Sequence, residues 1–255
     1  MELEKLFGLL DITSLDPLDD EIKIIGLARK VCNVYESTDE AFLPAAICVF
    51  PNWIFSLKEN CNSLPIEYAC VVGAFPLGQT FTQVKMLETH AAIEKGATEI
   101  DMVINRGLFL SGKLEDCAIE IKLLKDIVGN RRLKVIIESG ELDTEQNING
   151  AALLALHTGA DFVKTSTGKS TTGATPEAVK YICNAIRDFY GETGNKRGIK
   201  ISGGISTAEQ ALEYCEIIEN ILGKDWLRPE LTRFGASKLA NDILVKAGHA
   251  KLAGF

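Results

Sequence analysis

The sequence lacks the cysteine spacing of a disulfide framework or of a zinc site. Its seven cysteines are an odd number, no two of them form a C-x-x-C pair, and several lie in apolar runs. A reduced cysteine in such a run behaves as a small hydrophobic side chain. We therefore expect no structural metal, no disulfide framework and a reduced, cytoplasmic chain.

The sequence also lacks long apolar stretches, a basic leader and an excess of positive charge. It begins Met1-Glu2-Leu3-Glu4, which is acidic where a secretory signal needs basic residues, and no apolar run approaches the roughly 20 residues of a membrane span. Lys and Arg number 27 against 35 Asp and Glu, a net charge of -8. This balance argues against nucleic acid or an anionic membrane as the general partner, although local groups can still bind a small anion.

What the sequence does contain is an alternation of short apolar strands with amphipathic helices. Strands are predicted at about 10–14, 45–50, 67–75, 99–105, 133–139, 161–169, 198–204 and 233–237. Most are separated by helices, predicted at roughly 1–9, 21–33, 80–95, 114–128, 143–158, 176–190, 207–222 and 238–247. Such alternation implies parallel pairing with right-handed crossovers, and about 250 residues is typical of a (β/α)8 barrel.

We therefore predict an α/β protein, a (β/α)8 TIM barrel that forms a single domain over residues 1–255 with a short N-terminal helix. A doubly wound open sheet is the alternative. It is disfavoured because no G-x-G-x-x-G motif follows the first strand.

Two of the predicted strands carry a lysine in the middle. Lys164 shares one face of its strand with Phe162 and Ser166, and Lys200 lies opposite the apolar Ile199. A buried lysine must lose its charge or find a partner. One lysine on an edge strand could simply lie in water, but two such strands that both end in glycine-containing turns predict one shared site.

The same alternation predicts a charged barrel interior. Five ionisable side chains are expected to point inward from four strands, namely Asp101, Lys134, Glu138, Lys164 and Lys200. A barrel core is usually packed with branched apolar residues, and buried ion pairs are often no more stabilising than apolar substitutes. The cluster therefore indicates function rather than stability.

Two lysines held close together have a specific chemical consequence. Each disfavours protonation of the other, so one of them can be neutral near pH 7 although the usual pKa of lysine is about 10.4. A neutral lysine attacks carbonyls and forms Schiff bases. A carboxylate such as Asp101 can then move protons directly or through water.

Glycine-containing turns close the last three predicted strands. They are Gly168-Lys169, Gly203-Gly204 and Gly235-Ala236-Ser237. Phosphate sites in such barrels typically lie in the loops after strands 7 and 8, with a helix N-terminus directed at the anion. Ser237 is expected both to cap the last helix and to contact the phosphate. Capping alone would explain Ser237, but the three loops together favour a phosphate site.

At these residues the sequence resembles the deoxyribose-phosphate aldolases, a class I aldolase family on a (β/α)8 barrel. The resemblance runs through most of the chain and is most specific at the lysine-centred motif Phe162-Val163-Lys164-Thr165-Ser166-Thr167-Gly168-Lys169. The other matching segments are 10–13, 45–49, 75–78, 99–103, 134–140, 200–204 and 233–237.

The resemblance implies reversible cleavage of 2-deoxy-D-ribose 5-phosphate to D-glyceraldehyde 3-phosphate and acetaldehyde, a step of deoxyribonucleotide catabolism, with no cofactor and no metal. It makes Lys164 the Schiff-base lysine, Lys200 the cation that lowers the pKa of Lys164, and Asp101 the proton-transfer carboxylate. The substrate-binding positions of the family are matched by Asp11, Thr13, Cys48, Thr167, Gly168, Lys169, Gly203, Gly204 and Ser237.

Three positions depart from the family's pattern. Many relatives carry a basic residue where this chain has Ser206, and a small residue where it has Lys238. A cation in the first turn of a helix is mildly unfavourable, so a substrate phosphate beside Lys238 would account for it; a solvated surface lysine is the alternative. Some relatives also end in a tyrosine that reaches the site, whereas this chain ends in Phe255.

Two other interpretations stay open at this stage. One is a related lysine aldolase that acts on a different aldehyde or ketose phosphate, and the other is a non-catalytic sugar-phosphate-binding barrel. A pure binder has no use for a neutral lysine, which argues against the second. The expected partners are a small-molecule sugar phosphate and aldehydes, not nucleic acid or a membrane. A homodimer is left open.

Overall fold

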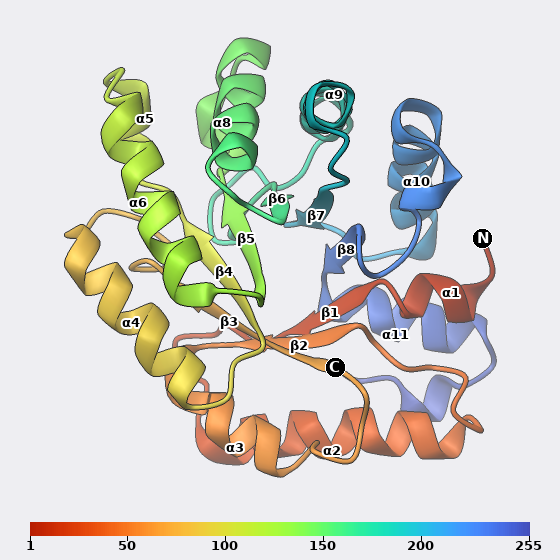
Figure 1. Cartoon of the computed structure of the whole chain (residues 1–255). Helices are drawn as coiled ribbons and strands as arrows, with labels where there is room; N and C mark the ends of the chain where they lie inside the picture. The colour runs from red at the N-terminus through yellow and green to blue at the C-terminus, as the bar shows by residue number, and fades with distance from the viewer.

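A closed barrel of eight parallel strands forms the centre of the chain (Figure 1). The computed structural model describes residues 1–255. The strands follow one another round the barrel in chain order: β1 Leu10–Thr13, β2 Ala46–Val49, β3 Glu67–Val72, β4 Glu99–Val103, β5 Arg132–Ile136, β6 Phe162–Lys164, β7 Gly198–Ser202 and β8 Thr232–Gly235. β8 pairs with β1 and closes the barrel. The predicted (β/α)8 architecture is confirmed, and an open sheet is excluded.

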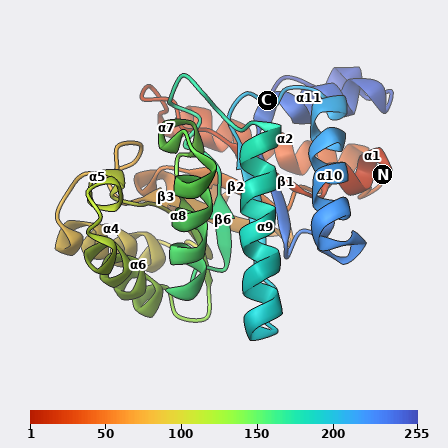
Figure 2. The same ribbon diagram turned by 90° about the horizontal axis from the view of Figure 1, so that it is seen from above.

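Helices surround the barrel and cover its outer face (Figures 1 and 2). One longer helix follows most strands: α2 Glu21–Ser37, α4 Thr82–Glu94, α6 Leu114–Val128, α8 Glu145–His157, α9 Pro176–Thr193, α10 Ala208–Leu222 and α11 Ser237–Lys246. The short N-terminal helix α1, Leu3–Phe7, packs against α10 and α11. No helix is both long enough and apolar enough to cross a membrane.

Side-chain hydrogen bonds fix where several of these helices begin. The carboxylate of Asp20 accepts from the backbone N–H of Lys23 at 2.8 Å and caps α2. Thr207 and Gln210 form a reciprocal capping box at α10. Thr175 caps α9 and is followed by Pro176, whose fixed φ suits the first helical position.

Short elements in the loops were not predicted from the sequence. They are the helices α3 Ile54–Glu59, α5 Arg106–Leu110 and α7 Ser139–Leu142, and the single 3₁₀ turns η1 Pro51–Trp53, η2 Lys224–Trp226 and η3 Ala250–Leu252. Segments of three to six residues are too short to show a helical repeat. The strands are also shorter than predicted, so the segment 165–169 belongs to the loop after β6 rather than to the strand.

The apolar core lies between the outer face of the barrel and the helices. It is one cluster of 63 buried residues, and Ile199 and Ile201 join it from β7. The barrel interior is different. A cluster of five, Leu15, Ala46, Cys48, Ala69 and Val71, fills the side formed by β2 and β3. Buried charged side chains, among them Asp11, Asp101, Lys134 and Lys200, also lie in the interior.

Candidate active site

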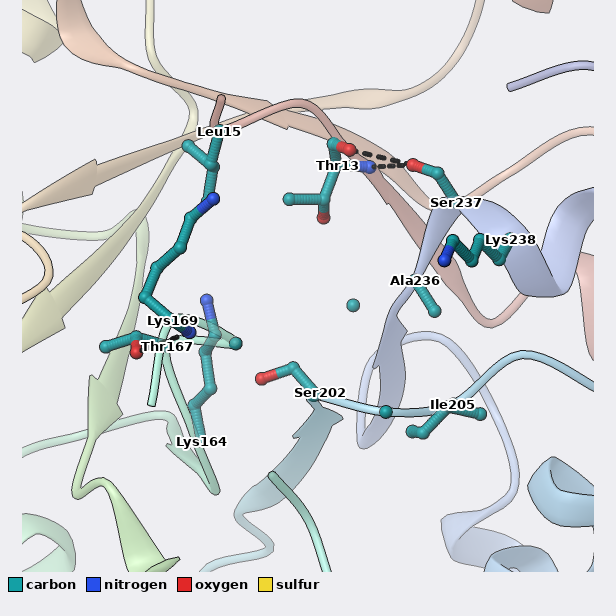
Figure 3. A pocket seen from close by; sticks show the side chains of 14 residues that line it. Thr13, Leu15, Lys164, Thr167, Lys169, Ser202, Ile205, Ala236, Ser237 and Lys238 are labelled. Carbon is teal, nitrogen blue, oxygen red and sulfur yellow. Dashed lines mark hydrogen bonds between the residues drawn. The ribbon is translucent and has the colours of Figure 1, made fainter. Parts of the chain in front are cut away.

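A cavity of about 230 Å³ opens at the carboxyl ends of the strands (Figure 3). Its walls come from the ends of β1, β6, β7 and β8 and from the loops that follow them. The lining residues are Thr13, Leu15, Lys164, Thr167, Gly168, Lys169, Ser202, Gly203, Gly204, Ile205, Gly235, Ala236, Ser237 and Lys238. This is the end of a parallel barrel at which active sites form.

Most of the residues predicted to form the site line this cavity. They are Thr13, Lys164, Thr167, Gly168, Lys169, Gly203, Gly204, Ser237 and Lys238. The other four, Asp11, Cys48, Asp101 and Lys200, are fully buried and do not line it. The lining residues Leu15 and Ile205 are apolar, so nothing in the sequence distinguished them as site residues. Ser202 and Ala236 lie within the matching segments 200–204 and 233–237 but were not predicted to bind substrate.

Asp101 in β4 connects three lysines beneath the cavity. Its Oδ2 accepts hydrogen bonds from Lys164 Nζ at 2.8 Å and from Lys200 Nζ at 2.7 Å, and its Oδ1 accepts from Lys134 Nζ at 2.9 Å. Burial by itself would raise the pKa of this carboxyl. The charges of the three lysines outweigh that effect and hold the pKa of Asp101 well below its usual value.

Two charged residues in this cluster, Glu99 and Arg233, were missed by the sequence analysis. Arg233 Nη2 donates to Glu99 Oε1 at 2.9 Å, and its Nη1 donates to Asp11 Oδ1 at 2.6 Å. The alternation of side chains along the strands could have placed both residues in the barrel interior. Glu99 lies two residues before the inward-facing Asp101, and Arg233 pairs in register with Lys200.

Lys200 contacts two carboxylates, and Lys134 contacts two closely and a third, Asp11, at 3.7 Å. Lys134 Nζ is 2.5 Å from Glu99 Oε2 in addition to its bond to Asp101. Lys200 Nζ is 2.5 Å from Asp11 Oδ2, an ion-pair contact whose geometry is poor for a hydrogen bond. Burial lowers the pKa of each lysine, but the neighbouring carboxylates outweigh it and raise the pKa of both.

Lys164 differs from these lysines in having a single carboxylate partner, Asp101. Its side chain points into the cavity (Figure 3), and the residue is 2% exposed. Burial lowers the pKa of Lys164, and the charge of Lys200 lowers it further, while Asp101 opposes both. Lys164 is therefore the amine of the cluster that gives up its proton most easily. The resemblance implied that the charge of Lys200 lowers the pKa of Lys164, and burial lowers it more strongly.

Glycines at the ends of β7 and β8 make room for this arrangement. A Cβ at Gly235 would lie 3.2 Å from Cε of Lys200 and 3.0 Å from Cβ of Ser202. Gly203 has a φ of 90°, and a Cβ there would lie 2.8 Å from Cα of Gly173. The glycine turns thus let backbone segments approach closely around the cavity.

Two sequence-based predictions at the site are wrong. Glu138 does not join the charged cluster, because β5 ends at Ile136 and Glu138 has a φ of 53° that turns it out of the strand alternation. Its carboxylate instead accepts hydrogen bonds from Thr167 and Ser170 in the loop after β6. Ser237 is not the N-cap of the last helix, since Ala236 has that position.

The hydroxyl of Ser237 joins two distant parts of the chain (Figure 3). It donates to the carbonyl of Thr13 at 2.7 Å and accepts from the N–H of Thr13 at 3.0 Å. The N-terminus of α11 is thereby fixed to the end of β1 at the cavity wall. Cys48 packs below, with its Sγ 4.0 Å from Asp101 Oδ2, and burial raises the pKa of its thiol.

No group of three or more His, Cys, Asp or Glu side chains is placed to hold a metal ion. The buried carboxylates of Asp11, Glu99 and Asp101 are each bonded to cationic side chains of the chain itself.

The sequence matches the profile of the DeoC/LacD family aldolases over residues 12–219. It is 38% identical to the deoxyribose-phosphate aldolase of Homo sapiens over 253 residues, which cover 94% of this chain and 79% of the human protein. It is 41% identical to the enzyme of that name from Bos taurus, with the same two coverages. The chain belongs to the DeoC/LacD aldolase family. This assignment confirms the resemblance found in the sequence and makes the chain a lyase-class enzyme.

Solved structures of the DeoC/LacD aldolase family share the fold. The tetrameric deoxyribose phosphate aldolase from Aeropyrum pernix superposes with a TM-score of 0.74 at 26% identity, over 96% of this chain and 93% of that one.

Proposed function

We propose that this aldolase cleaves 2-deoxy-D-ribose 5-phosphate reversibly to D-glyceraldehyde 3-phosphate and acetaldehyde through a Schiff base on Lys164. The main support is the position of Lys164. It is the lysine of the buried cluster with one carboxylate partner, and it is the one that reaches the cavity. The relatives described above carry the name of this activity.

The neutral amine of Lys164 attacks the aldehyde carbon of the open-chain sugar phosphate, and loss of water gives an iminium ion. The iminium withdraws electrons from the bond between the second and third carbons. The hydroxyl on the third carbon loses its proton as that bond breaks, which releases D-glyceraldehyde 3-phosphate. The enamine left on Lys164 is protonated and hydrolysed, and acetaldehyde and the free amine result.

Asp101 is the group placed to relay these protons. It is hydrogen-bonded to Lys164 Nζ and Lys200 Nζ at 2.8 and 2.7 Å. Because the depressed pKa of Asp101 keeps it ionised, we assign it the acceptor role, in which it takes a proton directly or through water. Lys200 stays protonated and acts by its charge.

The substrate phosphate is assigned to the cavity wall formed by the loops after β6, β7 and β8. Gly168, Gly203 and Gly204 line this wall, together with Lys169 and the first turn of α11. Helix N-termini and glycine turns favour anions through their unpaired backbone N–H groups. Since the hydroxyl of Ser237 already bonds to Thr13, we assign the phosphate contact at Ser237 to its backbone.

We also propose that residues 1–255 act as one catalytic domain, because both halves of the chain contribute strands to one barrel and residues to one cavity. A cytoplasmic location is proposed on the seven free cysteines, a state typical of reducing compartments.

Reductive trapping tests the assignment of Lys164. Acetaldehyde with borohydride is expected to leave one ethyl group on the peptide that contains Lys164, as measured by peptide mass mapping. Lys164→Met should not be labelled. Lys169→Ala, which removes another lysine of the cavity wall, should still be labelled at Lys164. An ethyl group on Lys169 or Lys200, with Lys164 unmodified, contradicts the mechanism.

A further inference from the structure

Beneath the cavity, six buried side chains form a closed ring of alternating charge. At distances below 3 Å, each cation of the ring contacts two of its anions, and each anion contacts two of its cations. Lys134 also lies 3.7 Å from Asp11 across the ring. Going round the ring, its members are Arg233, Glu99, Lys134, Asp101, Lys200 and Asp11. We call this set the charge ring. Its contacts measure 2.5 to 2.9 Å, and its members are 0 to 2% exposed.

Lys164 is attached to the charge ring at one point, through Asp101. The ring contains three cations and three anions, so its charges cancel when all six groups are ionised. A proton on Lys164 would add an uncompensated positive charge at a buried position, which is unfavourable. The balance of the ring therefore favours the neutral amine.

Arg233 lies opposite Asp101 in the ring, and Glu99 is next to Arg233, so neither contacts the carboxylate to which Lys164 is attached. Neither of them lines the cavity. Arg233 is held in place from outside the ring as well, since its Nε donates to the carbonyl of Pro229 and its guanidinium lies 5.9 Å from the ring centre of Phe162. Gly198 leaves space for the aromatic ring of Phe162, because a Cβ at position 198 would lie 2.4 Å from a carbon of that aromatic ring.

We propose that Arg233 and Glu99 are positioning residues that set the proton affinity of Lys164 by keeping the charge ring neutral. This inference rests on the proposed function, because it takes Lys164 as the reacting amine. It goes beyond that function by assigning a role to two residues that touch neither the cavity nor Lys164.

The other ionisable groups near the ring do not alter its balance. Cys48 from β2 is a neutral thiol, since burial raises its pKa, and β3 contributes the apolar Ala69 and Val71. Arg132 also donates to Glu99 Oε1, but it is paired with Glu67. Both of those side chains are about one-third exposed, so solvent screens their charges.

The proposal predicts that the sign of the removed charge decides the direction of the effect. Arg233→Gln leaves the ring with one excess negative charge, which favours the protonated form of Lys164 and raises its pKa. Glu99→Gln leaves one excess positive charge and lowers that pKa. Both residues lie two strands from β6, or about 10 Å at a strand spacing of about 4.8 Å. At that separation one charge shifts a pKa by about one unit.

The test measures kcat/KM for cleavage against pH, because its acid limb reports the pKa of the free enzyme's essential base. Arg233→Gln is expected to move the limb up by about one pH unit and Glu99→Gln to move it down by a similar amount. The double variant should return the limb to the position of the parent. Arg233→Lys keeps the charge and should leave it in place. Arg197→Gln is the matched control, since Arg197 pairs with Asp161 outside the ring.

A purely structural role gives a different result. Both single variants would then lose kcat/KM at every pH while the limb stays in place, and that outcome overturns the proposal, as does a shift of both in the same direction. If circular dichroism shows that a single variant does not fold, the double variant replaces it, and a displacement of its limb by about one unit overturns the proposal. Mass mapping of the trapped Schiff base in the parent tests the proposed function separately. A label away from Lys164 refutes that function, whereas a label on Lys164 with an unmoved limb refutes only the role of the ring.

Discussion

Lys134 and Lys164 lie on neighbouring strands, yet their surroundings shift their pKa values in opposite directions. Lys134 contacts Glu99 and Asp101, and its pKa is raised. Lys164 contacts only Asp101, and its pKa is lowered. Burial lowers the pKa of both, so the difference comes from the additional carboxylates near Lys134, which are Glu99 and, at 3.7 Å, Asp11. The reactivity of a lysine in this barrel is thus decided by its number of anionic neighbours.

Lys238 is the residue whose role depends most on the substrate. It lines the cavity at the start of α11, and its terminal nitrogen is directed toward the cavity (Figure 3). Ser206 does not line the cavity, and its N–H and hydroxyl donate to Gln210. We expect Lys238→Ala to lower kcat/KM about tenfold on deoxyribose 5-phosphate, or about 1.4 kcal/mol, and to leave unphosphorylated deoxyribose unaffected.

The control for this prediction is Lys180→Ala, which removes an exposed lysine of α9 that is not part of the cavity. It should leave the rates on both substrates unchanged. Equal losses on the two substrates for Lys238→Ala would mean that Lys238 does not bind the phosphate and is a solvated surface lysine.

At the residue level, the sequence predicted which charged side chains lie in the barrel interior, but not the ion pairs that set the pKa of each. Alternation along the strands placed Asp101, Lys134, Lys164 and Lys200 in the interior, and all four are there. It could not give the number of partners of each lysine, because that number depends on which strands become neighbours. The choice of Lys164 over Lys200 therefore depended on the resemblance to the aldolases.

The loop after β6 is held in place by one carboxylate from the loop after β5. Both oxygens of Glu138 accept from the N–H of Thr167 at 3.2 Å, Oε2 also accepts from the Thr167 hydroxyl at 2.5 Å, and Oε1 accepts from Ser170 at 3.0 Å. Glu138 is 1% exposed. Thr167 is followed by Gly168 and Lys169 in the cavity wall, so this contact fixes the geometry of the wall.

We expect Glu138→Gln to raise KM for the phosphorylated substrate about tenfold with a smaller effect on kcat. The amide keeps one acceptor but turns an NH2 group toward the donors of Thr167 and Ser170, which weakens bonds to a charged acceptor that contribute about 1.5 to 3 kcal/mol each. Steady-state kinetics measures the change. Glu141→Gln is the matched control, because Glu141 is about half-exposed and pairs with Arg106. The idea fails if kcat falls while KM is unchanged.

At the level of elements, the helices and strands of the barrel could be predicted, and the connections could not. The range 114–128 predicted for one helix agrees with α6. The helix α7 and the turn at Glu138 follow from the contact with Thr167, which is 29 residues away. The bond between Ser237 and Thr13 joins residues 224 apart. Contacts at such separations depend on barrel closure and leave no local pattern in the sequence.

For the molecule as a whole, one residue of the charged interior, Lys164, lowers the free energy of unfolding. The charge ring is internally compensated, but the pKa of Lys164 is lower in the folded chain than in the unfolded one. The unfolded chain binds the Lys164 proton more tightly than the folded one, so the lowered pKa of Lys164 destabilises the fold at every pH below the unfolded pKa of about 10.4. This loss of stability is complete at pH values below the pKa of Lys164 in the folded chain, and it disappears as the pH rises toward about 10.4.

We therefore expect Lys164→Met to be inactive and yet more stable than the parent at neutral pH. Each unit of pKa depression corresponds to about 1.36 kcal/mol, and about 1 kcal/mol raises Tm by about 2 to 4 °C in a chain of this size. Thermal melts at pH 7 and near pH 10 should show that the gain shrinks at the higher pH, because the unfolded lysine is then also losing its proton. Lys134→Met is the matched control. It leaves Glu99 and Asp101 with one cation fewer, and breaking such buried pairs destabilises a fold by about 3 to 5 kcal/mol. A lower Tm for Lys164→Met at pH 7, or a gain that grows with pH, would mean that Lys164 is protonated in the folded chain.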